Sequence, residues 1–309
     1  MARWDKEESS SIPDWFWEAV DTPAESRTVE VDECDVAYRL YPSPGKPGML
    51  LIHGMNAHSR WWDFIAPHLT DLYQVAAMDL TGMGDSDYRY EYSSATYAEE
   101  ILAVIEHAGL GADTLVVAHS FGGYMAVKAA NLHPEKFGGL ILVDSGIRHP
   151  DEPIPDRPNM GGMQGKIYPD RDSALMRFRL QPPQPCENEY ILQYIARNSL
   201  MPMDGGWAWK FDEDLFTTLT EVDRKPEDFQ SLTVPLGVIF GADSELYSRQ
   251  SLEYMQELVP QDFPFREIAD AQHHVFLDQP LAFVDALKEA VSYTHLTLPT
   301  NREVYISVV

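Results

Sequence analysis

Short apolar runs alternate with amphipathic stretches along most of this chain. Continuous apolar runs of this kind are typical of strands that are buried on both faces of a sheet. Between them, apolar residues recur at helical spacing, as at positions 101, 102, 104 and 105 of the stretch 97–107. Strands that alternate with helices predict an α/β fold, with a mostly parallel central sheet and helices on both faces. The predicted buried strands are residues 49–52, 74–78, 115–118, 139–143 and 236–240.

Weaker patterns complete the predicted core. Residues 28–31 and 35–40 alternate between polar and apolar positions, which predicts two antiparallel strands around a turn at 32–34. We expect an amphipathic helix over residues 13–20 and another from Ser59 to about Thr70. Further helices are predicted over residues 124–130, 250–258 and 281–290, and a short strand over residues 265–268.

The sequence changes character between residues 146 and 226. A proline-rich segment, residues 149–158, is followed by helix-like stretches and by no strong apolar run. This pattern predicts a helical cap inserted between two parts of the core. The resulting units are an amino-terminal extension over residues 1–27, a core over residues 28–145 and 227–291, and a cap over residues 146–226.

The last stretch of the chain does not fit this scheme. Residues 292–309 follow neither a helical nor a strand period. They resemble translated adapter sequence attached to fragmentary environmental genes. We therefore predict a non-native tail that takes no part in fold or function.

Composition narrows the class of protein. The chain has 49 Asp and Glu against 23 Lys and Arg, a formal net charge of −26. Because such a surface repels phosphate and no basic patch stands out, nucleic acid is not expected as a partner. The same charge favours solubility and would suit a saline environment. No window approaches the 18 or so uninterrupted apolar residues of a membrane span, so no membrane partner is expected.

The amino terminus and the cysteines point to a cytoplasmic protein. Residues 1–11 are polar and charged and lack the apolar centre of a secretory signal. Cys34 and Cys186 make no disulfide framework, and we expect two buried free thiols, with a single disulfide left open. No cofactor or metal is implied, because no phosphate-binding glycine motif opens a helix and His and Cys are scattered along the chain.

One turn concentrates the candidate chemistry. The buried run 115–118 leads within a few residues into a helix. A strand that reverses into a helix so quickly forces its apex residue toward positive φ and needs small residues around it. Ala118, Gly122 and Gly123 supply the small residues, and Ser120 stands at the apex. Its hydroxyl would project above the sheet edge at the positive end of the following helix.

This turn resembles the nucleophile elbow of the α/β-hydrolases, with Ala118 in place of the usual first glycine of G-x-S-x-G. Residues 79–86 are similar to a further glycine-containing segment of that family, and we assign them a structural role. The resemblance covers roughly residues 30–290. It implies a nucleophile, an acid and a base in that order along the chain. A serine at the apex argues against haloalkane dehalogenases and epoxide hydrolases, which carry an aspartate there.

The resemblance also implies a histidine base near the end of the chain. Family members usually carry it seven residues before the proline of a leucine–acid–x–proline segment. Here that proline is Pro280, and the spacing selects His273. We expect His274 to be its structural neighbour.

Two residues compete for the place of the acid. Asp243, just beyond the predicted strand 236–240, is where many family members keep it, although the common spacing there falls on Ser244. Some relatives with a serine at that point place the acid one strand earlier, which corresponds to Asp144. We slightly prefer Asp144, keep Asp243 open, and place Glu245 third.

Acyl transfer also needs donors for the oxyanion of the tetrahedral intermediate. In the family, one backbone N–H comes from the residue after the nucleophile, here Phe121. The other comes from the loop after an earlier buried strand, which points to Met55. Trp61, Trp62 and Tyr124 are the candidate lining of the substrate pocket.

The resulting expectation is a serine hydrolase that cleaves small-molecule carboxylic esters through an acyl-enzyme. One alternative is a carbon–carbon bond hydrolase of the meta-cleavage type, which needs cations to hold a dienoate carboxylate. Lactone and thioester hydrolases share the same machinery, and a hydrolase-like receptor would bind a ligand without turning it over. The predicted cap offers Arg171, Arg177, Arg179 and Arg197 to an anionic substrate.

Overall fold

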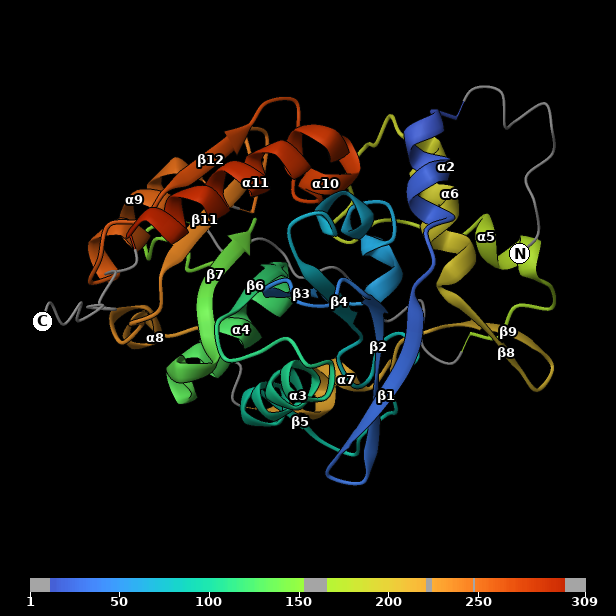
Figure 1. The fold of residues 1–309 in the computed structure, drawn as a ribbon. Helices are drawn as coiled ribbons and strands as arrows, with labels where there is room; N and C mark the ends of the chain where they lie inside the picture. Colours follow the sequence, from blue (N-terminus) through green and yellow to red (C-terminus); the bar gives the residue numbers. More distant parts are fainter. Residues whose placement is uncertain (1–11, 153–165, 221–223, 247, 298–309) are drawn as a thin grey trace, which may run out of the picture.

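A central sheet with helices on both faces organises the computed structural model, which describes residues 12–152, 166–220, 224–246 and 248–297 (Figure 1). Within these residues the sheet has eight strands in the order β1-β2-β4-β3-β6-β7-β11-β12. They are β1 (Glu25–Val31), β2 (Cys34–Tyr41), β3 (Gly48–Ile52), β4 (Gln74–Met78), β6 (Thr114–His119), β7 (Phe137–Val143), β11 (Leu236–Gly241) and β12 (Phe265–Ile268).

Strand directions confirm the predicted α/β fold. β1 pairs antiparallel with β2, and β2 pairs antiparallel with β4. From β4 to β12 all neighbouring strands are parallel. Because parallel strands end at the same edge of a sheet, the loops after β3, β6, β7, β11 and β12 gather there.

The apolar runs are continuous because both faces of the sheet are covered. In β3, Leu50 and Ile52 belong to one core cluster, whereas Met49 and Leu51 belong to the cluster on the opposite face. The first cluster includes α3 (Ser94–His107), α4 (Ser120–Leu132), α8 (Pro226–Gln230) and α9 (Arg249–Leu258). The second includes α2 (Asp14–Val20), η1 (Ser59–Trp62), η2 (Ala66–Leu69), α10 (Val275–Asp278) and α11 (Pro280–Thr297). η3 (Pro134–Lys136) precedes β7.

Two predicted helices differ from the structure. Residues 59–70 form the two short 3₁₀ turns η1 and η2 and not one continuous helix. Pro67 has no N–H to donate to the carbonyl four residues earlier, which opposes an α-helix at that point. α11 continues past residue 290 to Thr297, so the first six residues of the predicted tail are helical. The rest of that tail, residues 298–309, and residues 1–11 lie outside the described residues.

The chain between β7 and β11 contains helices, as expected, together with a hairpin that the pattern did not predict. The helices are α5 (Arg171–Leu175), α6 (Glu189–Asn198) and α7 (Leu215–Thr218). The hairpin pairs β8 (Leu200–Met203) with β9 (Gly206–Trp209). A further short strand, β10 (Leu219–Thr220), pairs with β5 (Tyr92–Ser93), which lies just before α3 in the sequence. These strands are too short and too exposed to give a clear alternation. The limits of the cap and of the other units stay predictions.

A buried carboxylate joins α6 to the sheet. Asp63 accepts hydrogen bonds from the Tyr194 hydroxyl of α6 at 2.6 Å, from the Tyr41 hydroxyl at 2.7 Å and from Arg39 Nε at 2.8 Å. The Asp63 side chain is only 2% exposed, and charge-assisted bonds of this kind are the strong ones. α6 also lies beside α2, with the ring of Phe16 4.9 Å from that of Tyr190 (Figure 1). Helix α6 is therefore fixed both to β2, through Asp63, and to α2.

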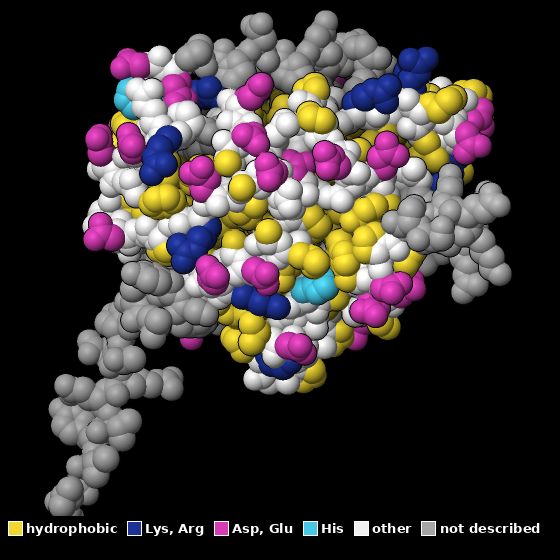
Figure 2. Space-filling model, turned by 90° about the horizontal axis from the view of Figure 1, so that it is seen from above, with side chains coloured by type: hydrophobic (Ala, Val, Ile, Leu, Met, Phe, Trp, Pro, Cys, Tyr) yellow, Lys and Arg dark blue, Asp and Glu magenta, His cyan; other side chains and the backbone are white. Residues whose placement is uncertain are grey.

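The surface reflects the composition. Figure 2 shows Asp and Glu side chains spread over the face seen from above, with Lys and Arg only at scattered positions. Cys34 and Cys186 are both free and half-buried. None of the helices in the described part of the chain is long and apolar enough to cross a membrane.

Candidate active site

Ser120 lies at the turn between β6 and α4. Its backbone φ is 51°, a left-handed conformation that costs a non-glycine residue energy and persists only where its surroundings impose it. Here the strand runs directly into the helix. A Cβ at Gly122 would overlap the carbonyl oxygen of His53, and a Cβ at Gly123 would overlap the hydroxyl of Ser145. The close packing around the turn explains the small residues that the sequence carries there.

Three side chains from three different loops form a hydrogen-bonded chain. His273 Nε2 lies 3.0 Å from Ser120 Oγ, and His273 Nδ1 lies 2.6 Å from Asp144 Oδ2. Ser120 follows β6, Asp144 follows β7, and His273 precedes α10. With a proton on Nδ1, the imidazole donates to the carboxylate and leaves Nε2 free to accept from the serine hydroxyl. The convergence of loops at one sheet edge thus brings together residues that are far apart in sequence.

The structure brings Asp144, and not Asp243, to His273. The Ser244 hydroxyl donates to Asp144 Oδ2 at 2.8 Å, and the Gly241 N–H donates to Oδ1 at 3.3 Å. Asp243 is exposed, and within the described residues its carboxylate forms no hydrogen bond. Glu245 is exposed as well. Ser244 therefore donates to the same Asp144 oxygen that contacts the imidazole and helps to hold it there.

The loop after β3 lies against the elbow. A Cβ at Gly54 would lie 2.8 Å from His119 Nδ1, so only a glycine fits between the two loops. Met55 follows in this loop, and Phe121 is the second residue of α4, where an N–H has no acceptor within the helix. Their assignment as oxyanion donors stays a prediction that the neighbouring positions of the two loops support.

A small cavity of about 80 Å³ opens beside Met55. Trp61 lines it, but Trp62 does not, because its fully buried ring stacks on Phe276 at a centroid distance of 4.4 Å. In a 3₁₀ turn, successive side chains point roughly 120° apart, so two adjacent tryptophans cannot face the same cavity. The other lining residues are Asn56, His58, Arg177, Phe178, Arg179, Gln181, Ser199, Trp209, Lys210 and Phe211.

Tyr124 also lies away from this cavity. It is almost fully buried on α4, and its hydroxyl lies 3.3 Å from Asp228 Oδ2 on α8. The Lys128 ammonium and the Arg224 guanidinium each lie 5.5 Å from the centre of its ring. Neither Trp62 nor Tyr124 lines this cavity, and both rings contribute to the packing between elements; their place in the substrate pocket stays a prediction.

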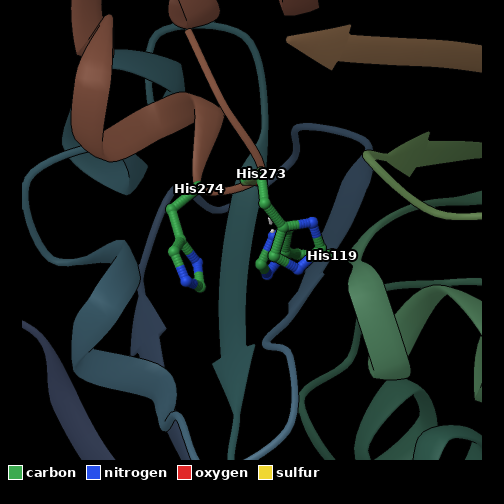
Figure 3. Close-up of side chains that lie close together, drawn as sticks. All are labelled: His119, His273 and His274. Atoms are coloured by element: carbon green, nitrogen blue, oxygen red, sulfur yellow. Dashed lines mark hydrogen bonds between the residues drawn. The ribbon is translucent and has the colours of Figure 1, made fainter. Parts of the chain in front are cut away.

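His273 also belongs to a cluster of three histidines (Figure 3). His119 ends β6, and His273 and His274 lie just before α10. One nitrogen of each ring lies within 4.8 Å of the others, and all three residues are buried. Burial lowers the pKa of His119 and of His274 well below 6.5. Sequence spacing gave no sign of this cluster, because the fold alone brings the end of β6 next to the loop before α10.

Comparison with known proteins places the chain in a family. Residues 49–286 match the Alpha/beta hydrolase family, so the chain belongs to it. The esterase Rv0045c of Mycobacterium tuberculosis is 23% identical over 248 residues, which cover 78% of this chain and 82% of that protein. A pimeloyl-[acyl-carrier protein] methyl ester esterase of Aeromonas hydrophila is 24% identical over 258 residues, which cover 79% of this chain and 95% of that protein.

A solved structure shows the same fold. The crystal structure of E-2-(acetamidomethylene)succinate hydrolase matches with a TM-score of 0.71 at 21% identity, and the match covers 87% of this chain and 100% of that one. The chain therefore shares the hydrolase fold over most of its length and has esterase relatives at low identity.

The pH dependence of stability tests how the loop after β3 is held. His53 Nδ1 donates to the Gly54 carbonyl at 2.7 Å, and Nε2 accepts from the Leu80 N–H at 3.1 Å. Burial lowers the pKa of His53 from 6.5 to about 4, and a second proton would break the bond from Leu80. The unfolded chain takes up this proton near pH 6.5, whereas the folded chain does so only near pH 4. We therefore expect stability to fall as the pH drops through this interval.

The measurement compares wild type with His53→Gln in urea unfolding at a series of pH values. The variant lacks this titration. The excess of the wild-type free energy of unfolding over that of the variant should therefore shrink by up to about 3 kcal/mol between pH 6.5 and pH 4. A difference between the two proteins that is the same at every pH would contradict the assignment.

Proposed function

We propose that this chain is a serine hydrolase that cleaves small-molecule carboxylic esters through an acyl-enzyme. The observation that carries the proposal is the chain of hydrogen bonds from Asp144 through His273 to Ser120. A serine hydroxyl is a weak nucleophile until an oriented base takes its proton. Here the base contacts the hydroxyl with one nitrogen, while the other nitrogen is held by a buried carboxylate.

The proposed reaction has two halves. Ser120 Oγ attacks the ester carbonyl while His273 Nε2 takes its proton, and Asp144 stabilises the imidazolium that forms. His273 then gives this proton to the leaving alcohol, which departs as the acyl-enzyme forms. A water molecule, deprotonated by the same nitrogen, attacks the acyl carbonyl and releases the acid and the free serine.

The oxyanion of each tetrahedral intermediate needs donors near the elbow. We assign the N–H groups of Met55 and Phe121 to this role, at the positive end of the α4 dipole. Loss of one such donor typically raises the barrier by about 2.7–4 kcal/mol. The esterases among the relatives support an ester substrate, although the identity to each is low.

Removal of the nucleophile is the first test. Ser120→Ala keeps the elbow and removes only the attacking oxygen, so steady hydrolysis of p-nitrophenyl butyrate should fall by at least about a thousandfold. The assay is the release of p-nitrophenolate at saturating ester, with Ser231→Ala, a change to an exposed serine just after α8, as a control that leaves the elbow untouched. Hydrolysis in Ser120→Ala near the wild-type rate would exclude the serine mechanism, and a wild type that binds esters without turnover would indicate a receptor.

A pair of variants tests the acid. Asp144→Asn removes the charge beside His273 and favours the wrong tautomer of the imidazole, so kcat should fall by about 10⁴ with little change in KM. Asp243→Asn changes an exposed side chain in the loop after β11 and should leave kcat close to wild type. Steady-state kinetics of both variants decide between the two residues. A large loss in Asp243→Asn with none in Asp144→Asn would reverse the assignment.

A second candidate is a carbon–carbon bond hydrolase for a substrate that carries a carboxylate. The cavity beside Met55 is lined by Arg177, Arg179 and Lys210 and, among the described residues, by no Asp or Glu. This is unusual in a chain with more than twice as many acidic as basic residues. The Lys210 ammonium is 2.5 Å from Asp85 Oδ1, whereas the Arg177 guanidinium forms no ion pair within the described residues. Arg179 also lacks an ion pair there, but its Nη1 donates to the carbonyl groups of Met176 and Phe178. Arg177 is therefore the cation best placed to meet an anion.

The other arginines of the predicted cap have different contacts. Arg171 Nη2 donates to the Arg197 carbonyl at 2.7 Å, and the Arg171 guanidinium lies 5.5 Å from the centre of the Trp207 ring. Neither Arg171 nor Arg197 lines the cavity. An anionic substrate would thus be recognised by the residues around Arg177.

A substrate panel separates the two candidates. We expect Arg177→Gln to raise KM by about tenfold for substrates with a free carboxylate, a monoester of a dicarboxylic acid and a 2-hydroxy-6-oxo-dienoate, because it removes their counter-charge. KM for a neutral ester of the same length should not change. Faster turnover of the dienoate than of every ester in wild type would favour the carbon–carbon hydrolase. Equal KM values for charged and neutral esters would exclude a role of Arg177 in anion recognition.

A further inference from the structure

The three histidine rings at the end of the sheet have the spacing of metal ligands. The ring centres lie 4.7 Å apart for His119 and His273, 4.9 Å for His273 and His274, and 5.4 Å for His119 and His274. A tetrahedral Zn²⁺ with Zn–N bonds of about 2.0–2.1 Å places the centres of its imidazole ligands about 5 Å from one another. Figure 3 shows the ring of His274 beside the rings of His119 and His273, which overlap in this view. The three rings are therefore close enough for one nitrogen of each to reach the same ion after a small movement.

Three of the ring nitrogens in this cluster lack hydrogen-bond partners within the described residues. His119 Nδ1 and both nitrogens of His274 are buried and form no hydrogen bond within the described residues. The carbonyl groups of Gln181 and Pro182 lie near the His274 ring without reaching hydrogen-bond geometry. Buried polar atoms are normally paired, and one left alone needs a reason. A ligand that accepts lone pairs would supply that reason.

The partners of the remaining nitrogens are those that orient histidine ligands. His119 Nε2 donates to the His273 carbonyl at 3.0 Å, which leaves the lone pair of its Nδ1 free. His273 Nδ1 contacts Asp144 at 2.6 Å, so the lone pair of its Nε2 accepts from Ser120 Oγ at 3.0 Å, a contact that a metal ion would replace. Histidine ligands of metals almost always donate their second N–H to a carboxylate or a backbone carbonyl. Two of the three rings are thus held in the tautomer and orientation that coordination requires.

We propose that His119, His273 and His274 form a binding site for a divalent transition-metal ion such as Zn²⁺, and that the bound ion switches the hydrolase off. The ligands are His119 Nδ1, His273 Nε2 and one nitrogen of His274, with a water molecule in the fourth position. Closing the nitrogens onto the ion takes about an ångström of movement of each ring from their present separations of up to 4.8 Å. Imidazole nitrogens select zinc, copper and nickel over calcium and magnesium.

Inhibition follows from the double use of one nitrogen. His273 Nε2 is the atom that would accept the Ser120 proton, and a metal on its lone pair leaves no base for the serine. The hydrogen bond to Asp144 persists in both states, because it involves the other nitrogen. The inhibition part of this proposal rests on the proposed function, whereas the binding part does not.

Metal binding is measured first, without reference to activity. The full chain is freed of metal with a chelator and titrated with Co²⁺, whose visible absorption reports four-coordinate binding, and Zn²⁺ is then added in competition. We expect one ion per chain in wild type and also in Ser120→Ala, because the serine is not a ligand. His274→Phe, which keeps a ring and removes the nitrogens, should weaken binding by at least about tenfold. His274→Gln is measured beside it, so that a folding defect in one variant does not decide the result.

Inhibition is measured second, with p-nitrophenyl butyrate. Zn²⁺ should abolish hydrolysis reversibly, EDTA should restore it, and Mg²⁺ and Ca²⁺ should have no effect. The His274 variants should need at least about tenfold more Zn²⁺ for the same inhibition. His133→Gln is the matched control, because His133 is half-exposed beyond the far end of α4, and its inhibition should equal that of wild type.

Two results would overturn the proposal: a wild type without affinity for Co²⁺ or Zn²⁺, or equal affinity in wild type and both His274 variants. Metal binding that is lost in the His274 variants supports the site even in a wild type that hydrolyses no ester. In that case only the proposed hydrolase function fails. Binding with full activity retained at saturating Zn²⁺ would reject the switch.

Discussion

The close approach of α4 to the loop after β3 is the constraint on which the rest of the site depends. Gly122 packs against the His53 carbonyl and Gly123 against Ser145, so the helix can begin directly at the end of β6. This packing holds Ser120 at a φ of 51°, a strain that the surrounding core must offset. The same contact brings Met55 and Phe121, the proposed oxyanion donors, to neighbouring loops. One steric condition therefore places both the proposed nucleophile and the proposed oxyanion donors.

Electrostatics also explains which carboxylate contacts the His273 imidazole. Asp144 is fully buried and receives hydrogen bonds from Ser244 and from the Gly241 N–H, which satisfy its other lone pairs. A buried carboxylate without such donors would be costly to keep charged. Asp243, although it lies in the same loop as Ser244, faces solvent, where its charge is screened and its reach to the imidazole is lost. The serine in that loop thus helps to hold the carboxylate of Asp144, the proposed acid, in place.

The histidines around this centre share one physical feature. His53, His119 and His274 are buried, and the low dielectric lowers the pKa of each, so they stay neutral near neutral pH. Because these rings carry no charge, they do not compete with His273 for the Asp144 carboxylate. Each neutral ring also keeps one nitrogen lone pair. His53 uses its two nitrogens to tie β3 to the loop after β4, whereas His119 and His274 leave nitrogens unused. That difference separates a structural histidine from a candidate ligand.

The sequence alone determined the elements that depend on local pattern. Runs such as residues 49–52 and 74–78 predicted their strands, and the residues around Ser120 predicted the elbow, because burial on both faces and tight turns leave a direct mark on residue type. The spacing to Pro280 singled out His273 in the same way, through a resemblance of motif. The pattern did not predict the hairpin β8–β9, the two turns in place of a helix at residues 59–70, or the extension of α11, because short or edge elements leave little periodicity in a sequence.

Only the tertiary structure could decide what lies side by side. The contact of His273 with Asp144, and not with Asp243, depends on which loop turns inward at the sheet edge, and no spacing along the chain encodes that direction. The placement of Trp62 in the core and of Trp61 at the cavity depends on the rotation of a single turn. The three histidines illustrate the same limit: His273 and His274 are adjacent in sequence, but His119 lies 154 positions before His273, and the parallel order of β6, β7, β11 and β12 brings it beside them. Residue type reflects local constraints such as burial and tight turns. A site, by contrast, depends on which loops meet at one edge of the sheet, and only the tertiary structure determines that.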